Sequence, residues 1–387
     1  MRLSERMSRL GTETAFEVLA RARALEAQGR DIIHLEIGEP DFNTPVHIVE
    51  AAIKALRDGH TGYTPSAGIP PLRQAIARQV SQRTGTEVRP EQVVVTPGAK
   101  PIMFFAILAL LQPGDEAIYP NPGFPIYESM INFVGARAVP LPLREEKAFR
   151  FDPDEFRRLV TERTRLIILN SPQNPTGGIL TREDLLIVAE VARERQIMVL
   201  SDEIYDHILY EGEHRSFLSL PGVQTQTILL NGFSKTYAMT GWRLGYGVMP
   251  VELAEQLTRL MVNSNSCTAA FTQYAGIAAL AGPHDDVGKM VAAFKERRDR
   301  LAAALNQIPG FRCANPAGAF YVFPNVQGTG MPSRALADYL LDKAGVALLD
   351  GACFGRYGEG YLRLSYANSL ENIQRALARI REALAAR

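Results

Sequence analysis

Cysteine is scarce in this sequence, and no group of metal-binding residues is visible. The three cysteines, Cys267, Cys313 and Cys353, lie far apart and are odd in number, which fits a reduced cytoplasm better than a disulfide framework. The six histidines show no His-Glu-x-x-His or similar spacing, so the pairs that hold zinc in many enzymes are missing. We therefore expect a cytoplasmic protein with no metal site.

The chain also has no net charge and no long apolar run. The 42 basic residues are balanced by 42 acidic ones, so the charge gives no reason to expect nucleic acid or an anionic membrane as a partner. The longest apolar run, residues 102–111, is about half the length of a membrane span. Residues 1–6 carry charges with no apolar run behind them, so we also expect no signal peptide.

The sequence does contain enough apolar material for a large enzyme-like fold. Its 387 residues, 46% of them hydrophobic, allow two domains and at least one large core. From about residue 45, helical segments alternate with short apolar strands, which predicts a mostly parallel α/β sheet buried on both faces. The strands expected in this sheet are 92–96, 116–119, 166–170, 197–201, 227–231 and 244–248. Elsewhere we expect helices at 13–28, 269–300 and 370–386, and a strand at 31–37.

Lys235 is the most informative residue of the chain. It follows the buried strand 227–231, with Ser234 beside it and Arg243 eight residues later. A lysine at a buried strand end can have its pKa lowered by desolvation and a nearby cation, which makes it a nucleophile toward a carbonyl group. Serine and arginine are donors that suit a phosphate. The pattern indicates pyridoxal phosphate, a cofactor with both groups; the alternative is a surface lysine after a strand.

Three other predicted strands end in polar or glycine-rich segments, at residues 98–100, 171–177 and 202–205. Ligands of open α/β sheets bind outside the carboxyl ends of the strands. Because these segments and Lys235 follow different strands of one sheet, we expect them to meet at one edge. Their convergence is more specific than any one of them.

The stretch from Asn231 to Tyr246 strongly resembles the lysine motif of class I/II aminotransferases, the pyridoxal-phosphate enzymes of fold type I. Further matches run in the expected order from Gly38 to Arg363. The resemblance implies a large domain at 45–285, with a mostly parallel sheet sandwiched by helices. It also implies a smaller α+β domain made of 1–44 and 286–387.

The resemblance places Lys235, Asp202 and Tyr205 around the cofactor ring as catalytic residues. Asp202 would keep the pyridine nitrogen protonated, so that the ring accepts electrons; in isolation it could equally cap a helix. Tyr205 and Asn174 would hydrogen-bond the phenolic oxygen, whereas a packed tyrosine and a turn asparagine are the alternatives. Phe124 would stack on the ring, although an isolated phenylalanine is more often part of a core.

The resemblance also assigns the cofactor phosphate. Helix N-terminal N–H groups bind phosphate, and the segment before the helix at Pro101 supplies them, although it could be an ordinary strand–helix turn. The phosphate-binding residues implied are Gly98, Ala99, Lys100, Ser234 and Arg243. Many relatives carry Ser or Thr where this chain has Gly232, so one phosphate hydroxyl is expected to be missing.

Arg363 and Gly38 match the residues that hold the α-carboxylate of the substrate. Arg363 alternates with apolar residues on a predicted strand, and would make a bidentate pair with the carboxylate; a lone arginine there could instead point to solvent. Gly38 would contribute a backbone contact, and Asn174 would lie beside the substrate. Tyr63 matches a tyrosine that reaches the phosphate of the neighbouring subunit, which implies a homodimer with shared active sites.

The function implied is amino-group transfer by a ping-pong mechanism, from an L-amino acid to a 2-oxo acid such as 2-oxoglutarate. Lys235 would shuttle the proton as general base and acid. An aspartate-specific enzyme, or a lyase or synthase on the same fold, is the nearest alternative. A ligand-sensing regulator would need a winged-helix head before Gly38, and a Rossmann dehydrogenase a Gly-x-Gly-x-x-Gly after the first strand; we find neither.

The side chain of the substrate and the backbone near the cofactor give two further expectations. A dicarboxylate substrate needs a second cation, and the uncharged residues 263–267 supply none. We therefore expect a pocket for neutral, aromatic or aliphatic amino acids. We also predict that at least one of the bonds Asn121-Pro122 and Asn174-Pro175 is cis, because the family often uses cis bonds at these places.

Overall fold

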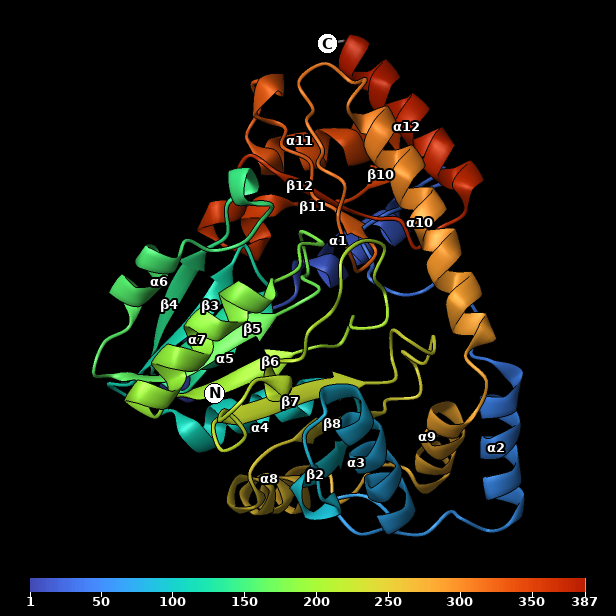
Figure 1. Ribbon diagram of the computed structural model, residues 1–387. Helices are drawn as coiled ribbons and strands as arrows, with labels where there is room; N and C mark the ends of the chain where they lie inside the picture. The colour runs from blue at the N-terminus through green and yellow to red at the C-terminus, as the bar shows by residue number, and fades with distance from the viewer. Residues whose placement is uncertain (387) are drawn as a thin grey trace.

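One large sheet forms the centre of the computed structural model, which describes residues 1–386 (Figure 1). The sheet has seven strands in the order β2-β8-β7-β6-β5-β3-β4. β8 is antiparallel to both its neighbours, and the remaining neighbours are parallel. The mostly parallel sheet predicted from the sequence is therefore confirmed. The strands are β2 Val93–Thr96, β3 Glu116–Asn121, β4 Arg137–Pro142, β5 Thr164–Asn170, β6 Met198–Asp202, β7 Thr227–Gly232 and β8 Gly245–Val248.

Two small sheets lie in the upper part of Figure 1. β1 (Ile33–His34) pairs in parallel with β10 (Val346–Ala347). β12 (Leu362–Ser365) lies between β11 (Leu349–Asp350) and β9 (Tyr321–Val322), antiparallel to both. A strand near the N-terminus thus pairs with one near the C-terminus.

Helices cover the sheets and connect them. The α-helices are α1 Thr14–Glu26, α2 Val46–Arg57, α3 Pro70–Thr84, α4 Lys100–Leu110, α5 Pro125–Phe133, α6 Pro153–Leu159, α7 Arg182–Arg195, α8 Val251–Ser264, α9 Ala270–Ala281, α10 Asp285–Leu305, α11 Ser333–Tyr339 and α12 Leu370–Ala385. Short 3-10 turns lie at Glu5–Arg9 (η1), Pro90–Gln92, Glu145–Lys147, Phe217–Ser219, Gln327–Thr329, Gly351–Phe354 and Arg356–Gly358, with a π-turn at Leu340–Ala344. α10 runs along one side of the molecule, from the level of the large sheet to α12 (Figure 1).

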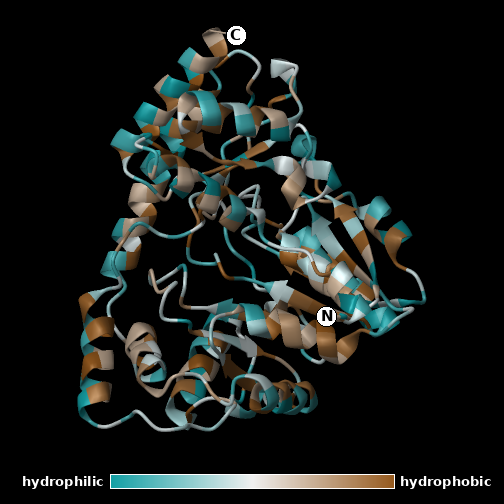
Figure 2. Cartoon of the chain, turned by 180° about the vertical axis from the view of Figure 1, so that it is seen from behind, coloured by the Kyte–Doolittle hydropathy of each residue, from teal (hydrophilic) through white to brown (hydrophobic). Residues whose placement is uncertain are grey.

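Alternation along the buried strands explains the layers. Leu166 and Ile168 of β5 pack into the core that α4, α5 and α8 cover. Ile167 and Leu169 belong instead to the core of α6 and α7, because successive side chains of a strand point to opposite faces. Figure 2 shows hydrophobic and hydrophilic residues along the same outer helices, as expected where only one face of a helix is buried.

The N-terminal segment contacts both the large sheet's helices and the C-terminal region. η1 contacts α5, and the Gly11 amide donates to the Ser129 hydroxyl at 2.9 Å. Further along, Arg21 of α1 pairs with Asp338 and Asp342. The segment therefore crosses from one layer of the molecule to the other before β1.

Three elements differ from the sequence expectations. The expected helix over 269–300 is two helices, α9 and α10, because Pro283 between them cannot donate a helical hydrogen bond. The expected strand over 31–37 is reduced to Ile33–His34. β4 was not expected; its two prolines obscure the strand pattern but are tolerated because β4 is an edge strand.

Both proline bonds singled out from the sequence, Asn121-Pro122 and Asn174-Pro175, are cis. The prediction that at least one would be cis is confirmed. Ser171-Pro172 is cis as well and was not predicted. None of the helices within residues 1–386 is both long and apolar enough to cross a membrane.

Gly245 of β8 generates a prediction about stability. A methyl group there would clash with the Ala99 backbone nitrogen and lie 2.5 Å from the Gly98 carbonyl carbon. Because backbone atoms cannot rotate aside, we expect Gly245→Ala to lower the free energy of unfolding by about 1–3 kcal/mol in a urea titration. Gly288→Ala on α10 is the matched control, since no atom lies within 4 Å of its new methyl group. Equal effects of the two changes would contradict the argument.

Candidate active site

A cavity of about 520 Å³ lies at the carboxyl ends of the central strands. The turns after β2, β5, β6 and β7 line one side of it, and Gly38, Tyr321 and Arg363 line another. The predicted site residues that line it are Gly38, Ala99, Lys100, Phe124, Asn174, Asp202, Tyr205, Ser234, Lys235, Arg243 and Arg363. Of the predicted set, Gly98 and Tyr63 do not line the cavity.

Lys235 is half-buried, and its amine faces the cavity. Its Nζ donates to the Gly38 carbonyl oxygen at 2.6 Å and lies 5.7 Å from the centre of the Phe320 ring. Burial lowers the pKa of Lys235 to about 8, and the charge of Arg363 adds to the lowering. A lysine with this pKa is partly neutral near neutral pH, so it can act as a nucleophile or a general base.

Asp202 is buried at the end of β6. Its Oδ2 accepts a hydrogen bond of 2.6 Å from the Tyr127 hydroxyl, and its Oδ1 accepts one from the Ile204 amide at 3.2 Å. Burial raises the pKa of Asp202 to about 6, while the Tyr127 hydrogen bond opposes the rise. The residue begins no helix, so a helix-cap role does not explain it. A buried carboxylate of this kind is suited to hold a cation in the cavity.

Gly98 lies against Arg243, which lines the cavity. Gly98 has a φ of +86°, which favours glycine, and a side chain there would clash with the Arg243 guanidinium. Arg243 donates to the Thr240 carbonyl oxygen at 2.7 Å, and Ser234 is buried nearby. Backbone N–H groups at the start of α4, a hydroxyl and a guanidinium therefore face one space, which is suited to an anion.

Arg363 is buried on β12 and held from several sides. Its guanidinium donates to Asn174 Oδ1 at 3.1 Å and to the Glu36 carbonyl oxygen. It lies over the Tyr321 ring, 4.4 Å from the centroid. Its Nε has no hydrogen-bond partner within the described residues. A guanidinium that is held in place and lines a cavity is suited to bind a carboxylate.

Aromatic side chains complete the wall. The Tyr205 hydroxyl lies 2.8 Å from that of Tyr321, and burial raises the pKa of Tyr205 well above its usual value. The Phe124 ring contacts the Tyr127 ring edge-on, with centroids 5.6 Å apart. These contacts fix the positions of both rings at the cavity.

The resemblance assigned Tyr63 and Lys100 to the cofactor phosphate, and the positions of both side chains need comment. Tyr63 is 92% exposed and does not line the cavity of its own chain. Lys100 lines the cavity, and its amine pairs there with Glu13. A Cβ on Gly232 would lie 3.1 Å from the Gly245 Cα, so a hydroxyl side chain there would need β8 to shift.

Sequence reasoning missed Tyr127, Tyr321 and Glu13, all of which line the cavity. Tyr127 lies on α5, three residues after Phe124, so helical spacing could have placed the two together. Glu13 begins the helix expected at 13–28, but that pattern does not place it at the cavity, and Tyr321 lies in a segment with no recognisable pattern. Their positions depend on how distant parts of the chain pack.

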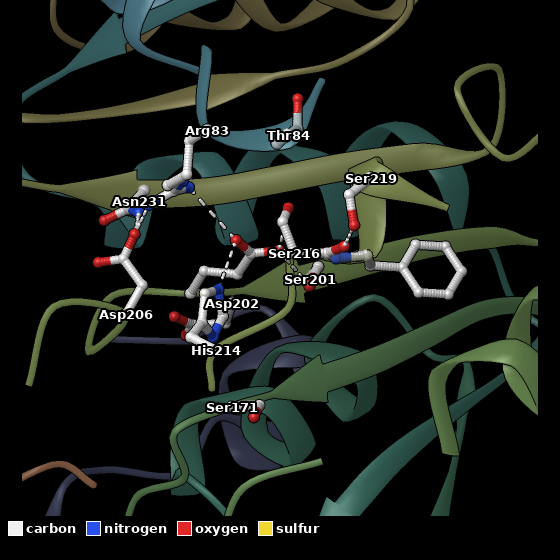
Figure 3. A network of polar contacts seen from close by, with 12 residues as sticks. Arg83, Thr84, Ser171, Ser201, Asp202, Asp206, His214, Ser216, Ser219 and Asn231 are labelled. Atoms are coloured by element: carbon white, nitrogen blue, oxygen red, sulfur yellow. Dashed lines mark hydrogen bonds and ion pairs between the residues drawn. The ribbon is translucent and has the colours of Figure 1, made fainter. Parts of the chain in front are cut away.

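A second polar cluster lies beside Asp202 and includes Arg83, Asp206 and His214 (Figure 3). Glu203 binds to two of these residues, Arg83 and His214. Glu203 accepts hydrogen bonds from Ser201 and Ser216 at 2.9 and 2.8 Å. Ligand atoms of Glu203, Asp206 and His214 lie within 4.8 Å of one another, a spacing that could hold a metal ion. Arg83, however, pairs with both carboxylates, and its charge opposes a metal cation there.

Known proteins are similar to this chain in sequence and fold. Residues 30–380 match the family of class I and II aminotransferases. An aspartate aminotransferase of Pyrococcus horikoshii is 41% identical over 99% of this chain and 97% of its own. The structure of Thermus thermophilus aspartate aminotransferase with maleate has a TM-score of 0.95 at 38% identity, covering 99% of this chain and 100% of its own. An aromatic aminotransferase of P. horikoshii has a TM-score of 0.90 at 38% identity, covering 95% and 99%.

The lowered pKa of Lys235 predicts a pH-dependent stability. Lysine ordinarily titrates at 10.5 and Lys235 at about 8, so the unfolded chain holds a proton that the folded protein releases between these values. The group therefore disfavours folding most below pH 8, and stability rises from pH 8 to 10.5. We expect Lys235→Met to raise the thermal midpoint of the cofactor-free protein below pH 8, with an advantage that shrinks over this window.

Scanning calorimetry of both proteins from pH 7 to pH 10.5 measures this difference. Lys289→Met is the matched control, since that lysine side chain is 77% exposed. We expect the difference in thermal midpoint between this variant and the wild type to stay constant with pH. A parallel course for Lys235→Met would show that burial does not perturb Lys235.

Proposed function

Since the chain belongs to the class I and II aminotransferases, which move an amino group from an amino acid to a 2-oxo acid, we propose that it does so with pyridoxal phosphate bound at Lys235. One observation carries the proposal: Lys235, Asp202 and Arg363 face a single cavity. These are an amine of lowered pKa, a buried carboxylate and a fixed guanidinium. Each suits a different part of the chemistry.

The two ends of the cavity support this cofactor. The Gly98 turn, with Ser234 and Arg243, suits a phosphate because it combines backbone N–H groups with a cation. Asp202 suits a protonated ring nitrogen, because a buried carboxylate needs a cationic partner. Tyr205 and Asn174 supply hydrogen-bonding groups between these ends. When bound, pyridoxal phosphate supplies an electron-accepting ring that stabilises the negative charge left on the substrate Cα.

The residues of the chain divide the remaining work. Arg363 holds the α-carboxylate of the substrate, and its own contacts with Asn174 and Tyr321 fix its orientation. Lys235 Nζ takes the proton from Cα and later returns one, since a base with a pKa of about 8 is matched to neutral pH. Asp202, ionised above its pKa of about 6, keeps the ring nitrogen protonated. The same site serves a second 2-oxo acid, in a ping-pong sequence.

The substrate proposed is a neutral amino acid, with 2-oxoglutarate as the acceptor. Ala15 and Phe16 of α1 line the cavity and offer an apolar surface. A second candidate, an aspartate-specific enzyme, is favoured by the P. horikoshii and T. thermophilus relatives and by Lys100, a cation in the cavity that residues 263–267 do not provide.

We further propose a cytoplasmic homodimer, with a large domain at 45–285 and a small domain made of 1–44 and 286–387; Arg387 lies outside the described residues. The exposed apolar side chains of Val46, Leu56, Tyr63 and Val262 support a contact between subunits. Tyr63 would complete the phosphate site of the neighbour. The small sheet that joins β1 to β10 supports the pairing of the N-terminal and C-terminal segments.

Asp202→Asn tests the proposed role of the cofactor. The amide is close in size to the carboxylate but carries no charge, so the variant should still bind pyridoxal phosphate while the amino acid half-reaction slows by about 100-fold or more. Single-turnover absorbance measurements give the rate. Tyr127→Phe, which removes only a hydrogen bond to Asp202, should slow it less. A rate for Asp202→Asn within a few-fold of the wild type would contradict the proposal.

Mixed subunits test the shared site. Lys235→Ala and Tyr63→Ala chains should each be nearly inactive alone. Unfolded together and refolded, they should regain about a quarter of the wild-type activity, because half of the dimers are mixed and each has one intact site. Light scattering checks the assembly. A fully active monomer would refute the shared site, as would mixtures that stay inactive although mixed dimers form.

A further inference from the structure

Glu13 has an unusual position at the start of α1. It is the N-cap residue, yet its side chain accepts no hydrogen bond from the helix N–H groups, which is the usual role of a polar N-cap. Its carboxylate accepts instead from the Lys100 amine, 87 residues further along the chain. Both side chains line the active-site cavity.

Lys100 is the one cation of the cavity, within the described residues, that has no place in the proposed chemistry. The charged donors that line the cavity are Lys100, Lys235, Arg243 and Arg363. The last three are assigned to proton transfer, the phosphate and the α-carboxylate. Lys100 begins α4, and its amine lies 5.3 Å from the centre of the Phe124 ring. It is therefore available for a group on the substrate side chain.

Glu13 determines how available that cation is. Its side chain is 22% exposed and that of Lys100 is 49% exposed, so the pair is partly desolvated. A second carboxylate, Glu39, lines the same cavity and accepts from the Thr240 hydroxyl. The charge of Lys100 is thus already balanced before any substrate enters.

We propose that Glu13 sets the side-chain selectivity of the enzyme by holding Lys100 in an ion pair that a neutral substrate leaves intact and a dicarboxylate must break. A neutral side chain packs beside the closed pair, against Ala15 and Phe16. A distal carboxylate, whether of aspartate or of the acceptor 2-oxoglutarate, has to take Lys100 from Glu13 and then lie near the carboxylate it displaced, so the pair weakens the binding of both. The inference rests on the proposed function, since it assigns the substrate class of that same site.

The pair also lies within electrostatic reach of the reacting amine. Burial has the largest effect on the pKa of Lys235 and lowers it. The charges of Glu13 and Glu39 raise this pKa, and those of Arg363 and Lys100 lower it. Opening the pair for a dicarboxylate therefore changes the charges around Lys235 as well as around the side chain.

A tether for the N-terminal segment is the competing explanation, because the pair joins residues near η1 to α4. Asp338→Asn is the matched control. Asp338 pairs with Arg21 of the same helix α1, with a side chain that does not line the cavity. A tether role predicts that both variants lower the thermal midpoint and leave selectivity alone.

Glu13→Gln is the test variant, with Glu13→Ala as a second form if the first folds poorly. We expect the ratio of kcat/KM for aspartate to that for leucine, both with the monocarboxylate pyruvate as the acceptor, to rise by about ten-fold. A readout without turnover is the dissociation constant of maleate, a dicarboxylate with no amino group, which should fall by about ten-fold. The constant of 4-methylpentanoate, a monocarboxylate, should change by less than about two-fold.

The double variant with Lys100→Gln separates the pair from a general charge effect. If Glu13 acts through Lys100, then Glu13→Gln should no longer tighten maleate binding once Lys100 is removed. Additive effects overturn the proposal, as does a substrate ratio within about two-fold of the wild type or an equal shift in Asp338→Asn. A wild-type protein that transfers no amino group from any donor would defeat the proposed function, whereas an active wild type with an unmoved ratio defeats only this inference.

Discussion

The site depends on keeping two oppositely charged groups, Lys235 and Asp202, poorly hydrated at the ends of neighbouring strands. β6 and β7 are adjacent and parallel, so Asp202 and the turn with Lys235 emerge at the same edge. Burial raises the pKa of Asp202 to about 6 and lowers that of Lys235 to about 8. Because desolvation penalises the charged form of each, both groups are suited to exchange protons near neutral pH.

Lys235 and Asp202 stay poorly hydrated only if other parts of the protein enclose the cavity and exclude water from it. The large sheet contributes only one side of the cavity, and the segments around Gly38, Tyr321 and Arg363 contribute another. The N-terminal segment enters through Glu13 and through the Gly38 carbonyl, which accepts from Lys235. Residues from both ends of the chain are therefore needed to complete the site, although its reactive groups, Asp202 and Lys235, lie near the middle of the sequence.

The Glu203 cluster supports the same region from outside the cavity. Glu203 follows Asp202 directly and is fully enclosed by donors, among them His214, Ser216 and the Phe217 amide. Burial has the largest effect on the pKa of Glu203 and raises it, but the His214 hydrogen bond and the charge of Arg83 together hold that pKa below its usual value. Because both carboxylate oxygens of Glu203 have partners, these contacts hold the backbone at the end of β6, where Asp202 must keep its direction.

The sequence by itself determined six of the seven strands of the large sheet and the polar turns that follow four of them. Continuous apolar runs are dictated by burial on both faces, and the polar turns after them must meet because parallel strands end at one edge. Only the tertiary structure decided where the amine of Lys100 points, that Tyr127 donates to Asp202, and that Glu13 reaches the cavity. These contacts join residues between 75 and 87 positions apart, and no local periodicity encodes them, because they depend on how α1, α4 and α5 pack against the sheet.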